Sequence, residues 1–203
     1  MIYYIKISTM CQELYSTMLK IILDKCLSIW YNMLMIKVYN NYMSIDDMTT
    51  LYTQAVTATY EIGWDDTSTI ENRQYPCLHH DYDRTNLSEF MHYFYDTPEL
   101  QNYTYEKAVI NLVTPSSVNF RHTHGDSRVI CYYINPEWRE EWYGETIFYQ
   151  DNGEDDRVIS YQPNKAVIFD GNHPHSIRPA SFIAPSYRFT LSVFFNKKLK
   201  NSS

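Results

Sequence analysis

One short segment of the chain combines residue types that could bind a metal ion. His124, Gly125 and Asp126 follow one another, and residues two apart in an extended segment point to the same face, so an imidazole and a carboxylate can converge there. His175, which follows the apolar run 167–169, is the natural third ligand from a distant strand. Two histidines and one carboxylate on one side of an octahedral ion leave its other positions open, as in non-heme Fe(II) oxygenases.

The histidines allow a second assignment of the ligands. His122 stands two residues before His124, so this pair competes with His124 and Asp126. His173 stands two residues before His175 and competes with it in the same way. We favour His124 and Asp126 because the iron in this class of site takes one carboxylate.

The composition limits the classes of function that fit the chain. Its 203 residues suit one domain of about 200 residues with a buried core. A net charge of -7, from 17 Lys and Arg against 24 Asp and Glu, argues against binding to nucleic acid through bulk charge. No glycine-rich phosphate loop, dinucleotide fingerprint or Gly-x-Ser-x-Gly element occurs, so these chemistries have no support.

The cysteines and the apolar runs bear on the location of the protein. No two cysteines form a Cys-x-x-Cys pair, which favours reduced thiols and a cytoplasmic protein. The most apolar stretch, residues 18–39, carries four charged side chains, so no membrane span is expected. The four cysteines are Cys11, Cys26, Cys77 and Cys131.

Helical patterns occupy the first half of the chain. Residues 1–42 are expected to form an N-terminal helical extension, with an apolar stripe from Leu19 to Leu34, and residues 43–200 the main domain. A helix is predicted to begin at Ser44, and another at Asn86. Residues 62–85 are polar and are expected to form a loop, in which the segment from His79 to Asp83 is solvated.

From Lys107 onward the pattern changes to short runs rich in Val, Ile, Tyr, Phe and Thr, separated by turn signals. Helices followed by many short strands predict an α+β domain with a sandwich or barrel of mainly antiparallel strands. The predicted strands cover residues 108–113, 128–135, 145–150, 157–162, 165–169 and 187–195.

Several motifs in this region resemble those of the prolyl 4-hydroxylase-like 2-oxoglutarate/Fe(II) dioxygenases. Their order and spacing fit over about residues 107–196. The motifs are CYYINPEW (131–138), WYGET (142–146), FDG (169–171), PHS (174–176) and RFT (188–190).

The resemblance implies a double-stranded β-helix of jelly-roll type, with iron held by His124, Asp126 and His175. It also implies that Arg188 binds the distal carboxylate of 2-oxoglutarate, because a planar guanidinium can bind a carboxylate with two hydrogen bonds. Tyr133 is expected to donate its hydroxyl to the same carboxylate, with help from Thr190.

Two departures from the family pattern concern the residues that bind 2-oxoglutarate. Tyr143 replaces the first glycine of the usual Trp-Gly-Gly-Glu-Thr, and the interval between His175 and Arg188 is longer than in many members. Arg178 is therefore a second candidate for binding 2-oxoglutarate.

The expected reaction is hydroxylation of a substrate C–H bond with release of succinate and CO2, so 2-oxoglutarate and O2 are expected partners. The nearest pattern suggests a peptidyl proline as substrate, although similar cores oxidise free amino acids and other small molecules. The alternative is a cupin-like module that binds a metal or small ligand without turnover.

Overall fold

The computed structural model describes residues 17–20, 36–63, 78–117, 120–150 and 155–198. The chain divides into two units, Met1–Ile36 and Lys37–Ser203. In the first unit, residues 17–20 are helical with exposed side chains; the rest of the predicted stripe up to Leu34 lies outside the described residues, as do three of the four cysteines. No helix of the described part has the length and apolar character that crossing a bilayer requires.

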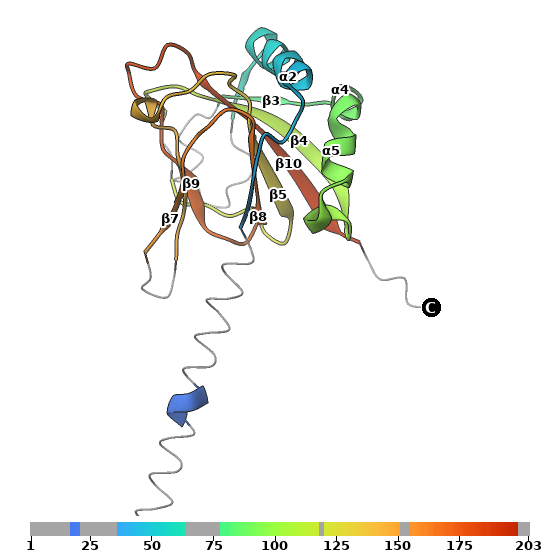
Figure 1. Cartoon of the computed structure of the whole chain (residues 1–203), viewed down its shortest axis with the longest axis vertical. Helices are drawn as coiled ribbons and strands as arrows, with labels where there is room; N and C mark the ends of the chain where they lie inside the picture. The colour runs from blue at the N-terminus through green and yellow to red at the C-terminus, as the bar shows by residue number, and fades with distance from the viewer. Residues whose placement is uncertain (1–16, 21–35, 64–77, 118–119, 151–154, 199–203) are drawn as a thin grey trace, which may run out of the picture. The chain divides into compact units, whose positions relative to one another are not determined.

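Two antiparallel sheets build the second unit (Figure 1). The large sheet has the order β1-β8-β5-β10-β4-β3-β2, and the small sheet has the order β7-β6-β9. The strands of the large sheet are β1 (Lys37–Asn40), β2 (Glu61–Ile62), β3 (Leu78–Asp81), β4 (Tyr103–Val113), β5 (Arg128–Tyr133), β8 (Lys165–Asp170) and β10 (Arg188–Lys197). Those of the small sheet are β6 (Thr146–Phe148), β7 (Arg157–Ile159) and β9 (His175–Ile177).

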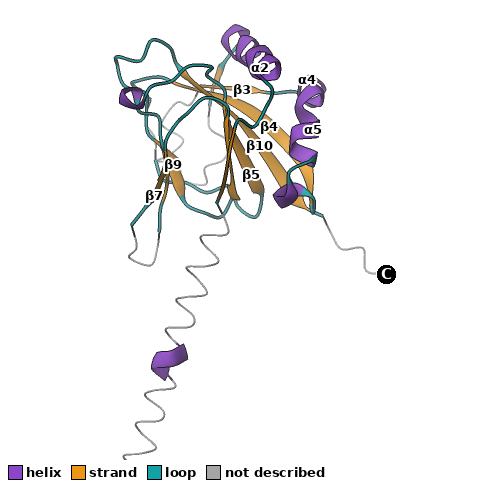
Figure 2. Ribbon diagram, viewed as in Figure 1, coloured by secondary structure: helices purple, strands orange, loops and turns teal. Residues whose placement is uncertain are grey.

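The helices cover one face of the large sheet, and the small sheet lies against its other face (Figure 2). They are α2 (Ile45–Thr57), α4 (Arg84–Leu87) and α5 (Met91–Tyr95), with short 3-10 turns at Ser88–Phe90 and Pro98–Leu100. A third 3-10 turn, Glu140–Trp142, lies on the side of the small sheet (Figure 1). Helices on one side of mainly antiparallel sheets confirm the predicted α+β class.

The two helix starts predicted from the sequence differ in outcome. Ser44 caps α2, because its hydroxyl oxygen accepts a hydrogen bond from the Asp47 amide at 3.1 Å. The next helix begins at Arg84 rather than at Asn86, because the Asp83 carboxylate caps it by accepting from the Thr85 amide at 2.9 Å.

Four strands, β1, β2, β3 and β9, lie where the sequence predicted none, among them β3 and β1 of the large sheet. The segment expected to be a loop contains β3, which pairs with β4. Three of its four residues are polar, so it lacks the apolar alternation from which a strand is predicted. β1 begins at Lys37, upstream of the expected boundary after residue 42, and pairs with β8. Both strands widen the large sheet, and β3 extends the face that carries the candidate site.

Candidate metal and cosubstrate site

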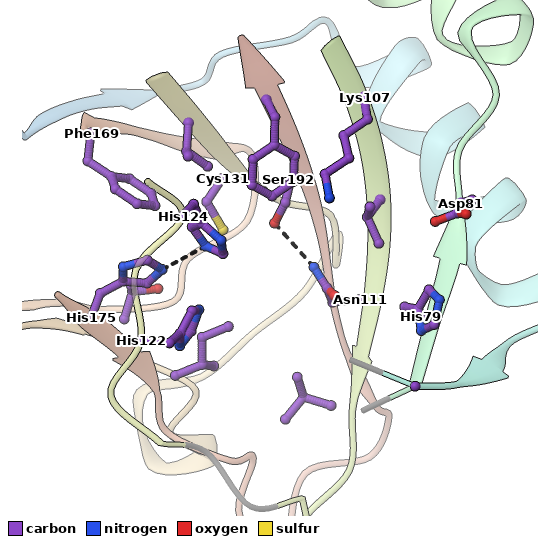
Figure 3. Close-up of a pocket in the computed structure, with 17 residues that line it drawn as sticks. His79, Asp81, Lys107, Asn111, His122, His124, Cys131, Phe169, His175 and Ser192 are labelled. Carbon is purple, nitrogen blue, oxygen red and sulfur yellow. Dashed lines mark hydrogen bonds between the residues drawn. The ribbon is translucent and has the colours of Figure 1, made fainter. Parts of the chain in front are cut away.

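Three histidines converge between the two sheets. The nitrogen atoms of His122, His124 and His175 that could bind an ion all lie within 4.8 Å of one another. The Nε2 atoms of His124 and His175 are 3.2 Å apart (Figure 3). Two nitrogens that bind one ion at right angles, each about 2.1 Å from it, lie about 3.0 Å apart, so this spacing fits a shared ion.

Backbone pairing fixes two of these histidines opposite each other. The amide of His122 donates to the carbonyl of His175, and the amide of His175 donates to the carbonyl of His122, both at 3.0 Å. Their Nδ1 atoms lie 3.0 and 2.8 Å from the carbonyl oxygens of Phe120 and His173. Because a carbonyl only accepts, Nδ1 carries the proton in both rings and Nε2 keeps the lone pair that an ion needs.

Asp126, which we expected to complete the ligand set, is not part of this group. Its carboxylate is exposed and accepts a hydrogen bond from the side-chain Nδ2 of Asn172 at 2.6 Å. The reason is the backbone at Gly125, whose φ of +67° turns the chain after His124. The alternation of an extended segment therefore holds for His122 and His124 and ends before Asp126.

Burial keeps the most enclosed histidine neutral. His175 is 4% exposed, and burial, followed by its neighbours His122 and His124, holds its pKa well below the usual value. A neutral imidazole is the form that binds metals, so His175 needs no proton release at neutral pH to act as a ligand. His173 lies outside the group and packs against the Phe148 ring.

Arg188 is a buried cation that forms no ion pair with the described residues. It is fully buried, and its Nε donates to the carbonyl of Gly144 at 2.8 Å. Its Nη1 and Nη2 atoms are also buried and have no hydrogen-bond partner in the part of the chain that the structure describes. The rings of Tyr161 and Tyr133 lie 4.7 and 5.4 Å from its Cζ, which offsets only part of the cost of burying the charge. A bound anion would stabilise this buried charge.

The residues around Arg188 suit a carboxylate ligand. The Tyr133 hydroxyl hydrogen-bonds the Thr146 hydroxyl at 2.8 Å, and Thr190 is the register partner of Tyr133 on β10. Tyr133 and Thr190 are fully buried. Burial raises the pKa of Tyr133, so its hydroxyl keeps the proton that it could donate.

The backbone next to Arg188 is closely packed against its side chain and favours glycine. A Cβ added at Gly144 would lie 3.1 Å from Cδ of Arg188, and the φ of Gly144 is +92°. The preceding Tyr143 also has a positive φ, of 60°, although it replaces a glycine of the family pattern. The Arg178 guanidinium lies 3.6 Å from the centre of the Tyr143 ring and 3.6 Å from the Glu145 carboxylate. Arg178 is therefore engaged outside the site, which leaves Arg188 as the candidate anion binder.

One cavity holds the three histidines and borders the surroundings of Arg188, Tyr133 and Thr190, none of which is among its lining residues. It is lined by the three histidines and by Thr146, which bonds Tyr133, and Val113, the register partner of Arg188. Side chains of β3 and β4 line the opposite side (Figure 3). A sequence model of the 2OG-Fe(II) oxygenase superfamily matches residues 72–196, which is more than half of the 203-residue chain. The chain belongs to this superfamily.

Solved structures of 2OG-Fe(II) oxygenases share the fold. A Pseudomonas putida prolyl-4-hydroxylase is similar with a TM-score of 0.60 and 14% identity, over 80% of this chain and 92% of that one. A Trichoplax adhaerens prolyl hydroxylase bound to a hypoxia inducible factor peptide gives a TM-score of 0.56 and 15% identity, over 80% and 83%. HygX from Streptomyces hygroscopicus, with nickel, 2-oxoglutarate and hygromycin B bound, gives a TM-score of 0.59 and 8% identity, over 81% of this chain and 83% of that one.

No curated protein sequence matches the chain. The family and these folds confirm the predicted double-stranded β-helix and the assignment of Fe(II) and 2-oxoglutarate as cofactor and cosubstrate. The donor set of this oxygenase fits the metal, since imidazole nitrogens bind iron and other first-row ions. The buried Arg188, with two unpartnered nitrogens, fits the carboxylate of the cosubstrate.

Sequence reasoning gave His122 a secondary place and left out two residues of the cavity. His79 and Asp81 line the cavity from β3, in the segment expected to be a solvated loop. The signal for His122 was present, since it stands two residues before His124. No comparable signal marked His79 and Asp81, because their position depends on pairing with β4.

Proposed function

We propose that the protein is an Fe(II)- and 2-oxoglutarate-dependent hydroxylase that oxidises a C–H bond of its substrate. The observation that carries this proposal is the pairing of two sites in one cavity region. Three histidine nitrogens lie within 4.8 Å of one another beside a cavity that Cys131 also lines, and the charge of Arg188 is close enough to Cys131 to act on the pKa of that buried thiol. Among the described residues, Nη1 and Nη2 of the buried Arg188 have no hydrogen-bond partner. A metal with open positions and a fixed anchor for a dicarboxylate are the two requirements of this chemistry.

The residues of the chain have separate tasks in this reaction. When bound, Fe(II) and 2-oxoglutarate supply the oxidising power, with O2 as the oxidant and succinate and CO2 as the products. Arg188 anchors the distal carboxylate of 2-oxoglutarate, and the Tyr133 hydroxyl donates to the same group. Thr190 borders this pocket from β10. The apolar side chains of the cavity exclude water from the site.

We further propose His122, His124 and His175 as the metal ligands, in place of the set with Asp126 expected from the sequence. Their convergence supports this set, and the turn at Gly125 directs Asp126 toward Asn172. Three neutral imidazoles add no negative charge to the ion. The bound iron then keeps its full charge toward the anionic cosubstrate, which strengthens that interaction.

The proposal names the reaction, hydroxylation of a C–H bond, and does not name one substrate. A peptidyl proline was the substrate expected from the sequence, and two of the similar structures are prolyl hydroxylases. Another similar structure holds hygromycin B, so the fold accommodates different ligands. The cytoplasmic location expected from the cysteines stays a prediction.

The test is an anaerobic titration of the purified protein with Fe(II) and 2-oxoglutarate. We expect a weak visible charge-transfer band that appears only when both are present, and succinate once O2 is admitted. The variant His175→Ala should give neither, because it removes the most buried ligand. Binding of the metal with no band and no succinate would contradict the proposal and favour a metal-binding module without turnover.

A further inference from the structure

Along β10, the side chains on the cavity face change from large to small and back to large. Phe194 lies at the metal end, because its ring centre is 5.0 Å from that of His124. Ser192, Thr190 and Arg188 follow at two-residue steps on the same face of the strand. Two small side chains therefore lie between the histidines and the arginine proposed to anchor 2-oxoglutarate.

Cys131 of β5 lies beside the first of these small side chains. It is the register partner of Ser192, and Tyr133, two residues along the same strand, is the partner of Thr190. Cys131 and Ser192 both line the cavity that holds the three histidines (Figure 3). We call Cys131 and Ser192 the Cys131 row. This row lies between the metal site and the residues around the buried arginine.

The Cys131 row is close to a group that binds anions. Nη1 and Nη2 of Arg188 are buried and have no hydrogen-bond partner among the described residues, which indicates an anionic ligand. Burial raises the pKa of the Cys131 thiol, and the charge of Arg188 opposes this effect only in part. The thiol therefore keeps its proton at neutral pH and adds no negative charge beside such a ligand.

The surface that the row offers to a ligand is small and apolar. The Ser192 hydroxyl accepts a hydrogen bond from Nδ2 of Asn111 at 3.2 Å and also hydrogen-bonds the Cys131 thiol, so it is engaged within the wall. The thiol behaves as a small hydrophobic group. It suits methylene carbon, and 2-oxoglutarate carries two methylene groups between its keto acid end and its distal carboxylate.

From this arrangement, and resting on the function proposed above, we infer that Cys131 forms the floor beneath the two methylene groups of 2-oxoglutarate and limits which 2-oxo diacids bind. The unbranched chain fits over the small row, with its keto acid end at the metal and its distal carboxylate at Arg188. A methyl branch on the chain meets the sulfur, and a packed site accommodates such an addition poorly. Cys131 is then a specificity-determining residue for the cosubstrate.

The experiment compares 2-oxo diacids that differ by one methyl group. The full chain is loaded anaerobically with Fe(II) and titrated with 2-oxoglutarate, 3-methyl-2-oxoglutarate and 4-methyl-2-oxoglutarate, each through the visible band that its keto acid end gives on the metal. We expect at least one methylated acid to bind the native protein at least about tenfold more weakly than 2-oxoglutarate, the effect of one ill-fitting carbon in a pocket.

Two variants of Cys131 change the room above the row in opposite directions. Cys131→Ala should raise the affinity for that methylated acid, relative to 2-oxoglutarate, at least about tenfold, and poor folding cannot produce such a gain. Cys131→Leu should weaken binding of 2-oxoglutarate at least about tenfold, because the added carbon fills the place of the methylenes. Its affinity for Mn(II) should match that of the native protein.

Val109→Ala is the matched control. Val109 lines the same cavity from β4, so the variant enlarges the cavity away from the Cys131 row. The ratio of the affinities for the methylated acid and 2-oxoglutarate should stay as in the native protein.

The outcomes separate this inference from the function on which it rests. A native protein that shows no band with Fe(II) and 2-oxoglutarate refutes both. A band with 2-oxoglutarate and equal affinity for both methylated acids overturns the role of Cys131 alone. The same role is overturned if Cys131→Ala gains nothing, if Val109→Ala gains as much, or if Cys131→Leu binds 2-oxoglutarate as the native protein does.

Discussion

The two faces of the large sheet differ although the same strands build both. On β10, Leu191 and Val193 point toward the helices and belong to the apolar core, whereas Arg188, Thr190 and Ser192 point toward the cavity side. β4 has an apolar helix side and a mixed cavity side. Ala108, Ile110 and Leu112 belong to the apolar core, whereas Lys107, Val109, Asn111 and Val113 line the cavity.

Neighbouring residues of one strand therefore serve different purposes, one for stability and the next for the chemistry of the site. Side chains of a strand alternate between faces, so neighbouring positions serve different requirements. The helix face buries apolar area, which is the main source of folding free energy. The cavity face keeps polar groups, among them the Arg188 cation, whose Nη1 and Nη2 have no hydrogen-bond partner among the described residues and whose burial costs stability. We expect substitutions on the two faces to act on different measurements.

The largest expected effect on stability comes from the helix face. Leu191 is fully buried between Ile110 and Tyr132 of the neighbouring strands. Leu191→Ala should lower the free energy of unfolding by about 2–5 kcal/mol, because it leaves a cavity in the core. Urea denaturation measures this, with Ser192→Ala as the matched control one residue away. An equal loss in both variants would remove the distinction between the faces.

The next largest effect is expected on the cavity face, where a substitution should weaken ligand binding without lowering the free energy of unfolding. Arg188→Met should weaken binding of 2-oxoglutarate by about 10- to 100-fold, since a hydrogen-bonded charge pair contributes about 1.5–3 kcal/mol. The free energy of unfolding should stay level or rise, because a buried unpaired charge is replaced by an apolar side chain. Titration of 2-oxoglutarate and urea denaturation of the same sample give both values.

Arg178→Met is the control for this prediction. Arg178 stacks on Tyr143 and pairs with Glu145, so its loss should leave the affinity for 2-oxoglutarate close to that of the native protein. A large loss of affinity in this variant, with native affinity in Arg188→Met, would exchange the roles of the two arginines.

The smallest effect should come from the start of α2, on the helix side. Ser44→Ala removes the hydroxyl that accepts from the Asp47 amide, and should lower the free energy of unfolding by about 1 kcal/mol. Binding of metal and of 2-oxoglutarate should not change. Thermal unfolding of the metal-free and metal-loaded protein checks both statements, and weaker metal binding would show that α2 influences the site.

The sequence predicted those parts of the molecule that depend on local pattern or on motifs. The run from Arg128 to Tyr133 has the apolar character of a buried strand, and Ser44 has the capping pattern of a helix start. The motifs around His175 and Arg188 indicated the family, which the match to residues 72–196 confirmed. These features are encoded within short segments.

What the sequence did not reveal depends on a single backbone angle and on pairing between distant strands. The spacing of His124 and Asp126 suits a ligand pair only in an extended chain, and the positive φ of Gly125 ends the extended segment between them. His79 and Asp81 reach the cavity because β3 pairs with β4, and a polar strand carries no periodic apolar signal. Neither feature can be derived from residue types alone.

The central claim is that His122, His124 and His175 hold the metal, and one comparison tests it most directly. The affinity for Mn(II), followed by the EPR signal of the free ion, is measured for His122→Ala and Asp126→Ala alongside the native protein. We predict that His122→Ala loses at least about 100-fold in affinity, more than the loss of a group that only supports a ligand, and that Asp126→Ala binds as the native protein does. Native affinity in His122→Ala, with loss of binding in Asp126→Ala, would contradict the account.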